Sequence, residues 1–240
     1  MSDEYKYNDL TMEEYERRKR ERAKARELRE KRRRLLKRVC IALLALIIIV
    51  AAVLLITKAH RNRAADTDIV ETLAETKIPS WIDKQIIAEG SASRQGEKLT
   101  GVKSIVIHYV GSAGTTAQQN RDYFGEPGTK SSSHFIIGLD GEVIQCLPLD
   151  EKSSSTGKRN PDTISIEVCH PDEDGKFSDK SYASLVKLTA WLCDLCELDP
   201  EAGVIRHYDA TGINCPAYYV EHEDAWAQFV KDVGAALKKG

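Results

Sequence analysis

Apolar and polar positions along the last two thirds of the chain alternate between two kinds of pattern. Short apolar, β-branched runs predict strands at 104–110, 134–138, 142–147 and 163–169. Helical spacing predicts helices at 115–124, 182–198 and about 223–238. The Asp140-Gly141 pair between the second and third runs is a hairpin turn signal. Strands interleaved with helices predict an α/β domain, with a central mixed sheet flanked by helices.

A different pattern occupies residues 39–57, which read VCIALLALIIIVAAVLLIT without a charge. As a helix this run is roughly 28 Å long, close to the hydrocarbon thickness of a bilayer. A buried helix of a globular domain would usually keep a polar stripe, and this run has none. A cleavable signal peptide has an apolar core of about 7–15 residues after a short basic region, whereas 38 residues precede this one. The pattern therefore predicts a single transmembrane helix that acts as a signal anchor.

Charge is distributed unevenly on the two sides of this run. Residues 1–58 carry 16 Lys and Arg against 9 Asp and Glu, and residues 59–240 carry 19 against 28. The basic excess lies before the apolar run, so the positive-inside rule predicts a cytoplasmic N-terminus. The acidic balance of the rest argues against a nucleic-acid partner, because binding phosphates needs clustered Lys and Arg.

These patterns divide the chain into four parts. We expect a basic cytoplasmic tail at 1–38, the transmembrane helix at 39–57, a polar juxtamembrane linker at 58–78 and an extracellular domain at 79–240. The predicted topology is a single-pass, type II protein of the cell membrane. Membrane lipid is then a partner through the single span, and the tail can also attract anionic lipid.

Histidine and cysteine residues are candidates for metal ligands. His207 and Cys215 bracket residues 208–214, which we expect to form a loop, and His108 lies near the end of the first predicted strand. Ligands at a strand end and in a loop can converge on one point, as in catalytic zinc sites with three protein ligands. Spacing alone leaves this open. His170 and His222 are expected on the surface.

Four runs resemble motifs of one family, in the family's order. They are IVIHY (105–109), SSHFII (132–137), ISIE (164–167) and RHYDATG followed by CP (206–212 and 215–216). They resemble the type-2 N-acetylmuramoyl-L-alanine amidases, which include phage endolysins and animal peptidoglycan-recognition proteins. The resemblance extends from about Trp81 to the C-terminus. It implies a central mixed sheet flanked by helices, and hydrolysis of the amide between N-acetylmuramic acid and L-alanine in bacterial peptidoglycan.

The resemblance also implies the roles of individual residues. His108, His207 and Cys215 would hold Zn²⁺ and leave the fourth position to water, and Glu167 would be the general base. Without the motif, strand alternation could equally point Glu167 to solvent. His134 and Tyr109 are expected to contact the substrate, although His134 could instead be structural. Permanent tethering favours remodelling of the cell's own wall.

The chain departs from the family pattern at two places. Many relatives carry Lys two residues before the Cys ligand, where this chain has Ile213, and loss of such a donor can cost about 10²–10³ in rate. Some also carry His just before the position of Gly157, where this chain has Ser155 and Thr156. These departures keep two alternatives open: a membrane-anchored peptidoglycan-binding module with weak or no turnover, and a zinc hydrolase of another amide.

The remaining extracellular cysteines have no assigned chemistry. Cys193 and Cys196 have the spacing of a redox motif but lie late in a predicted helix, which favours packing. Together with Cys146 and Cys169 they could form disulfides outside the cell, and spacing does not decide this.

Overall fold

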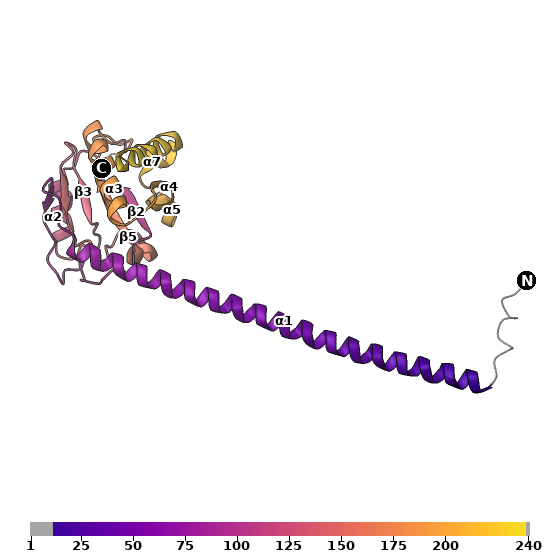
Figure 1. Ribbon diagram of the computed structural model, residues 1–240. Helices are drawn as coiled ribbons and strands as arrows, with labels where there is room; N and C mark the ends of the chain where they lie inside the picture. The colour runs from indigo at the N-terminus through magenta and orange to yellow at the C-terminus, as the bar shows by residue number, and fades with distance from the viewer. Residues whose placement is uncertain (1–11, 239–240) are drawn as a thin grey trace, which may run out of the picture. The chain divides into compact units, whose positions relative to one another are not determined.

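The computed structural model describes residues 12–238 (Figure 1). Its contacts divide the chain into two compact units, the first ending at Arg61 and the second beginning at Asn62. One helix, α1 (Met12–Glu75), contributes to both units, and it continues through most of the stretch expected as a linker.

The first unit consists of α1 up to Arg61. Its apolar segment leaves its large side chains exposed, including Ile41 at 68% and Leu55 at 69%. By length and composition, α1 is the one helix of the described residues that could cross a membrane. The candidate transmembrane segment at 39–57 is thus part of one continuous helix. An apolar helix surface that no protein covers is suited to contact with lipid.

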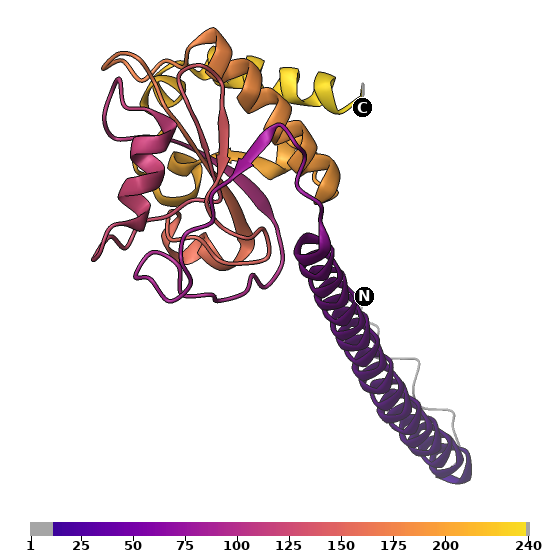
Figure 2. The same cartoon turned by 90° about the vertical axis from the view of Figure 1, so that its left-hand side faces the viewer.

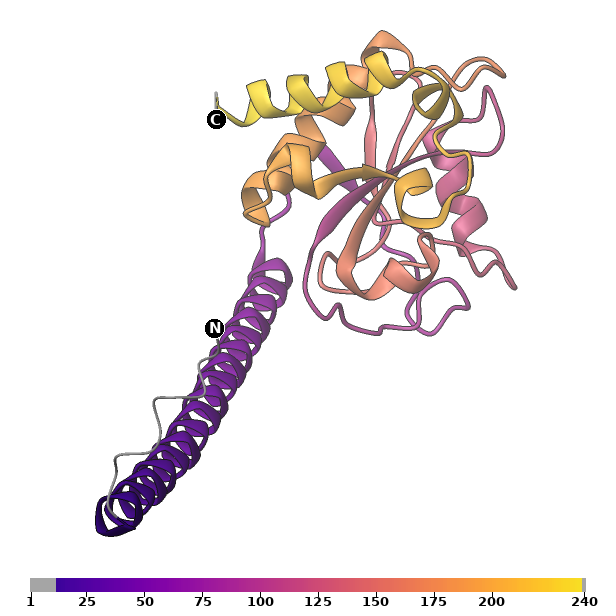
Figure 3. The same ribbon diagram turned by 90° about the vertical axis from the view of Figure 1, so that its right-hand side faces the viewer.

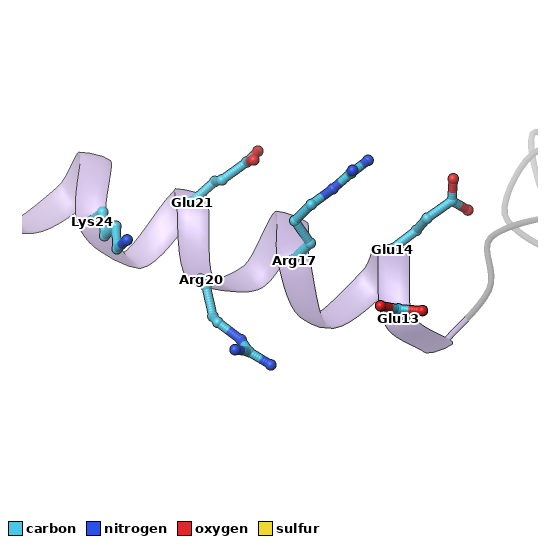
Figure 4. A pocket seen from close by; sticks show the side chains of 6 residues that line it. All are labelled: Glu13, Glu14, Arg17, Arg20, Glu21 and Lys24. Carbon is cyan, nitrogen blue, oxygen red and sulfur yellow. The ribbon is translucent and has the colours of Figure 1, made fainter.

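The first turns of α1 carry charges of both signs on a solvated surface. Ion pairs at helical spacing join Lys19 to Glu16 at 3.5 Å and Lys31 to Glu27 at 2.7 Å. Figure 4 shows that the side chains around this surface diverge from the helix axis and form no enclosed site; they are Glu13, Glu14, Arg17, Arg20, Glu21 and Lys24. We therefore assign no binding function to these turns.

The second unit is built on a mixed sheet with strand order β1-β4-β3-β5-β2-β6. The strands are β1 (Ile82–Lys84), β2 (Ser104–Tyr109), β3 (Phe135–Ile137), β4 (Val143–Gln145), β5 (Thr163–Val168) and β6 (Val204–Arg206). All neighbouring pairs are parallel except the β3–β4 hairpin. The predicted mixed sheet and hairpin are confirmed. No apolar pattern predicted β1, because three residues are too few to show periodicity.

Helices cover both faces of this sheet (Figures 2 and 3). α3 (Asp179–Leu195) and α7 (Glu223–Leu237) pack on one face over the larger hydrophobic core. α2 (Ala117–Gly125) covers the other face over a smaller core that contains Phe124 and Ile136. The last turns of α1 add Leu73, only 2% exposed, to the larger core.

Side chains of β2 alternate between these two faces. Ile105 and Ile107 belong to the larger core under α3 and α7. Since successive residues of a strand point to opposite faces, His108 points to the face that α2 covers. Strand alternation therefore buries a polar side chain, 2% exposed, beside the smaller core.

Side-chain caps set the residues at which α2 and α3 begin. Thr116 caps α2 by accepting a hydrogen bond from the Gln119 backbone N–H, and the Gln119 side chain accepts from the Thr116 N–H. Ser178 caps α3 through the Ser181 N–H, so this helix begins three residues before the predicted start at 182. Gly141, at φ +84°, makes the hairpin turn, where a Cβ would meet the Lys180 carbonyl oxygen at 2.8 Å.

The prediction of a loop at 208–214 is wrong for residues 208–211. Residues His207–Thr211 form the short helix α5. Arg206 and Asp209 stabilise its start, because the Asp209 carboxylate accepts from both the Arg206 backbone N–H and its guanidinium. Gly212, at φ +79°, ends the helix in the left-handed conformation. This capping is local chemistry that the apolar pattern did not reveal.

Candidate metal centre

The site lies at the carboxyl ends of three adjacent parallel strands. β2 pairs with β5 so that His108 and Glu167 are register partners, and β2 pairs with β6 so that Ile107 faces Arg206. His207, the next residue after Arg206, therefore follows at the level of His108. In open α/β sheets this edge is the usual location for ligands.

Cys215 reaches the same place through closure of its loop. The Tyr208 backbone N–H donates to the Cys215 carbonyl oxygen at 2.9 Å, which brings the two ends of the 207–215 segment together. The Cys215 Sγ lies 3.9 Å from the His108 Nδ1, and the His108 and His207 ring centroids are 4.4 Å apart. The candidate ligand atoms of His108, His207 and Cys215 all lie within 4.8 Å of one another.

This donor set fits a zinc ion. Two imidazoles and one thiolate are ligands that zinc prefers, and ligand atoms on a tetrahedral zinc lie roughly 3.5 Å apart. The observed separations require only small side-chain movements. Three protein ligands leave one position open, which is the arrangement of catalytic rather than structural zinc sites.

Burial shapes the protonation of these ligands. Burial, and to a lesser degree the neighbouring His207, lowers the pKa of His108 to about 3, and burial lowers the pKa of His207 as well. Both imidazoles are therefore neutral near pH 7 and have a free lone pair. Burial and the Glu167 carboxyl raise the pKa of Cys215 to about 12 in the metal-free protein. A bound divalent cation would reverse this by favouring the thiolate.

Glu167 is the acidic side chain next to these ligands. Its Oε1 lies 3.9 Å from the His108 Nδ1, and its side chain is 18% exposed. Its Oε2 is buried and has no hydrogen-bond partner. Burial raises the pKa of Glu167 to about 8. A buried carboxyl oxygen without a partner is costly unless a ligand or water completes it, which is common at functional sites.

A cavity of about 280 Å³ opens beside this cluster. Serine hydroxyls and two apolar side chains, Phe124 and Ile213, form much of the remaining wall. The lining residues are His108, Tyr109, Phe124, Ser131, Ser132, Ser154, Ser155, Glu167, His207, Ile213, Asn214 and Cys215. All four residues expected to carry the chemistry thus face one polar cavity.

The two residues expected to contact substrate lie in different environments. Tyr109 lines the cavity and its ring is 5.0 Å from that of His170. His134 is completely buried and is not among the lining residues. Its Nδ1 accepts from the Ser165 backbone N–H at 3.1 Å, and its Nε2 donates to the Glu151 carbonyl oxygen at 2.8 Å. With both ring nitrogens bonded, His134 is positioned as a structural residue.

The expectation for His170 is wrong, whereas His222 is on the surface as predicted. His170 is only 3% exposed. Its two ring nitrogens lie 2.7 Å from the Asp172 carbonyl oxygen and 2.8 Å from the Val110 carbonyl oxygen. The residues just after β5 and β2 therefore lie side by side at one edge of the sheet, a non-local contact that local polarity does not predict.

Sequence reasoning missed the hydroxyl wall of the cavity. Ser132 and Ser154 pair across an isolated antiparallel bridge, and Ser131 and Ser155 line the cavity beside them. A signal was available, because the tetrapeptide Lys-Ser-Ser-Ser occurs twice, at 130–133 and 152–155. Cys146, Cys169, Cys193 and Cys196 are all buried and free, so packing accounts for them in this structure.

The fold and the site together define an α/β protein with a candidate zinc centre at the carboxyl edge of its sheet. Comparison with known proteins agrees with this class. Residues 98–218, half of the chain, match the N-acetylmuramoyl-L-alanine amidase family, Amidase_2. The chain belongs to this family. The resemblance found from the four motifs is thereby confirmed.

Individual relatives resemble the second unit. The N-acetylmuramoyl-L-alanine amidase BlyA of Bacillus subtilis (strain 168) is 31% identical over 165 residues, which cover 60% of this chain and 44% of BlyA. The N-acetylmuramoyl-L-alanine amidase CwlL of Bacillus licheniformis is 30% identical over 173 residues, which cover 64% of this chain and 47% of CwlL. The chain thus spans about half the length of these curated relatives. The catalytic domain of XlyA superposes with a TM-score of 0.56 at 26% identity, covering 63% of this chain and 98% of that domain.

Proposed function

We propose that this chain is a membrane-anchored, zinc-dependent N-acetylmuramoyl-L-alanine amidase. Its substrate would be the amide that joins N-acetylmuramic acid to L-alanine in bacterial peptidoglycan, and its role would be remodelling of the cell wall. The observation that carries this proposal is the cluster of His108, His207 and Cys215 beside Glu167 in one cavity. Membership in the amidase family supports the choice of substrate.

The residues divide the work between metal binding and proton transfer. His108, His207 and Cys215 would hold the zinc, which when bound supplies a Lewis acid and lowers the pKa of water. Glu167, 3.9 Å from the His108 Nδ1, would take a proton from the attacking water and return it to the leaving amine nitrogen. Tyr109 and the serine wall would contact the sugar or the peptide.

The decisive experiment is digestion of purified peptidoglycan by the full chain in detergent. Mass spectrometry should detect peptides with a free N-terminal L-alanine, and a chelator should abolish their release until zinc is restored. Binding to muropeptides without release of peptides would instead support the binding module, which Ile213 favours. Equal cleavage of a free peptide and an intact muropeptide would support a hydrolase of another amide.

The apolar segment of α1 supports the proposed location. Its 19 uncharged residues are exposed in the first unit and would be covered by lipid. The 14 Lys and Arg between positions 17 and 38, against 3 acidic residues, favour a cytoplasmic tail and an extracellular amidase domain. Residues 1–11 of this tail lie outside the described residues.

Protease protection tests this topology. A protease added to intact spheroplasts should degrade the domain after residue 58 and leave the basic tail intact. Protection of the domain, with loss of the tail, would contradict the proposed orientation.

A further inference from the structure

Outside the candidate metal ligands, the structure contains a row of hydroxyl groups that begins beside His108. The Thr156 Oγ1 lies 3.4 Å from the His108 Nε2 and 3.1 Å from the Ser155 Oγ. The Ser155 Oγ is in turn 3.1 Å from the Ser153 Oγ. Thr156 and Ser153 are completely buried. Thr156, Ser155 and Ser153 thus form a continuous hydrogen-bonded path, in which the half-buried Ser155 also lines the cavity.

The path ends at Ser165, whose hydroxyl lies beside a second buried histidine, His134. The Ser165 hydroxyl donates to the Ser153 Oγ at 2.9 Å, and its oxygen lies 3.2 Å from the His134 Nδ1. His134 is fixed by its bonds to the Ser165 N–H and the Glu151 carbonyl. The Ser165 hydroxyl proton goes to Ser153, and the His134 Nδ1 accepts from the Ser165 N–H, so the Ser165 Oγ contacts the His134 ring without a hydrogen bond to it. Four hydroxyls therefore lie in a row between the His134 ring and the imidazole of the metal centre.

The two nitrogens of His108 have different surroundings. Nδ1 faces the Cys215 Sγ and the Glu167 Oε1, both at 3.9 Å. Nε2 points to Thr156. For Nδ1 to present its lone pair to a metal, the proton of the neutral ring must be on Nε2, and the Thr156 Oγ1 is the acceptor for it. The nitrogen that a ligating histidine does not use is normally held in this way.

We propose that Thr156 is a positioning residue of the metal centre, and that the hydroxyls of Thr156, Ser155, Ser153 and Ser165 orient His108 for zinc. This inference rests on the zinc site of the proposed function. Thr156 accepts the Nε2 proton of His108, fixes the tautomer and holds the ring plane toward His207 and Cys215. It touches neither substrate nor metal.

The backbone around Thr156 is built to hold this hydroxyl in place. The Asn160 Oδ1 accepts from the Thr156 N–H at 2.6 Å and from the Ser155 N–H at 3.2 Å. Gly157, at φ +59°, then turns the chain into the 3-10 helix η2 (Gly157–Asp162). A residue with a side chain is strained at this φ, so the turn after Thr156 depends on glycine. These contacts fix the position of the Thr156 backbone.

Zinc affinity of the full chain, measured by competition with a chromophoric chelator, tests the proposal without any substrate. Thr156→Val keeps the shape of the side chain and removes the acceptor, so the zinc Kd should rise about 10- to 100-fold. Thr156→Ser should restore the Kd to within about threefold of the wild type. Thr189→Val is the matched control, because Thr189 is also completely buried but its Oγ1 has no partner.

A second variant covers the case in which Thr156→Val fails to fold. Ser153→Ala breaks the path two links away from His108, and its zinc Kd should rise several-fold with no change at the ligands. The positioning role would be overturned if the zinc Kd were unchanged in both Ser153→Ala and Thr156→Val. It would also be overturned if Thr189→Val raised the zinc Kd as much as Thr156→Val does. Either outcome would leave the zinc amidase proposal intact. Absence of zinc binding in the wild type would overturn both.

Discussion

His108 and Glu167 are register partners on the parallel strands β2 and β5, with the Nδ1 of one 3.9 Å from the Oε1 of the other. Adjacent parallel strands place register partners on the same face of the sheet. The pairing of two strands far apart in sequence therefore sets a candidate ligand and a candidate base side by side, with side chains that are 2% and 18% exposed.

Glu167→Gln should separate catalysis from metal binding. The amide has nearly the same shape but cannot accept a proton, so kcat on peptidoglycan should fall about 10²–10⁴-fold. The zinc Kd should stay within about threefold, because Glu167 is not a ligand in this proposal. Release of muropeptides and chelator competition measure the two quantities, with the exposed Glu126→Gln as the control. A full loss of zinc binding in Glu167→Gln would contradict the assignment.

Arg206→Met should destabilise the second unit. The Arg206 side chain is 8% exposed and donates to the Asp209 carboxylate, the Glu223 carboxylate and the Tyr219 carbonyl. Its loss should lower the free energy of unfolding by about 2–3 kcal/mol, less than for a fully buried pair because its acidic partners are partly in water. Urea denaturation measures this.

The same substitution should weaken zinc binding, since His207 follows Arg206 directly. Arg159→Met provides the comparison, because Arg159 is one-third exposed and pairs with Asp162. Its effect on unfolding should be under about 1 kcal/mol. Equal destabilisation by the two substitutions would show that burial of Arg206 does not matter.

His134 should make stability depend on pH. Burial lowers the pKa of His134 to about 4 in the folded protein, below its ordinary 6.5. Between these values the unfolded chain binds a proton that the folded protein excludes. The contribution of His134 to the free energy of unfolding is therefore complete above pH 6.5. It is lost as the pH falls toward 4, by at most about 1.4 kcal/mol per pH unit.

Comparison with His134→Gln isolates this contribution from other titrating groups. The difference in the free energy of unfolding between wild type and variant should shrink from pH 7 to pH 4.5. Parallel stability curves over that range would mean that His134 does not exclude a proton in the folded state.

Ile213→Lys should raise the rate. Ile213 is 57% exposed and lines the cavity, and the motif resemblance implies a Lys at this position. A lysine there would supply a cationic donor to the developing oxyanion, so kcat should increase about tenfold or more. Ile213→Met, similar in size but uncharged, is the control for side-chain flexibility. Equal rates in the two variants would show that the cavity does not use a cation at this position.

Much of the fold was predictable from the sequence because it depends on local patterns. The β-branched runs around Ile105 and Ile164 defined the central strands, the Asp140-Gly141 pair defined the hairpin, and 19 uncharged residues defined the candidate span. Motif resemblance also picked out the types of residue in the site. Each of these signals is contained within a few consecutive positions.

Tertiary structure decided which of these residues meet. Periodicity tells which side of a strand is buried but not which strands pair, so the register of β2 with β5 and β6 could not be read locally. Burial of His170 and the approach of Thr156 to His108 likewise depend on chain segments that fold back from a distance. The sequence motifs thus identify the residues of the site. Their distances, their protonation and the hydrogen bonds to neighbouring hydroxyls arise only when distant strands pack together.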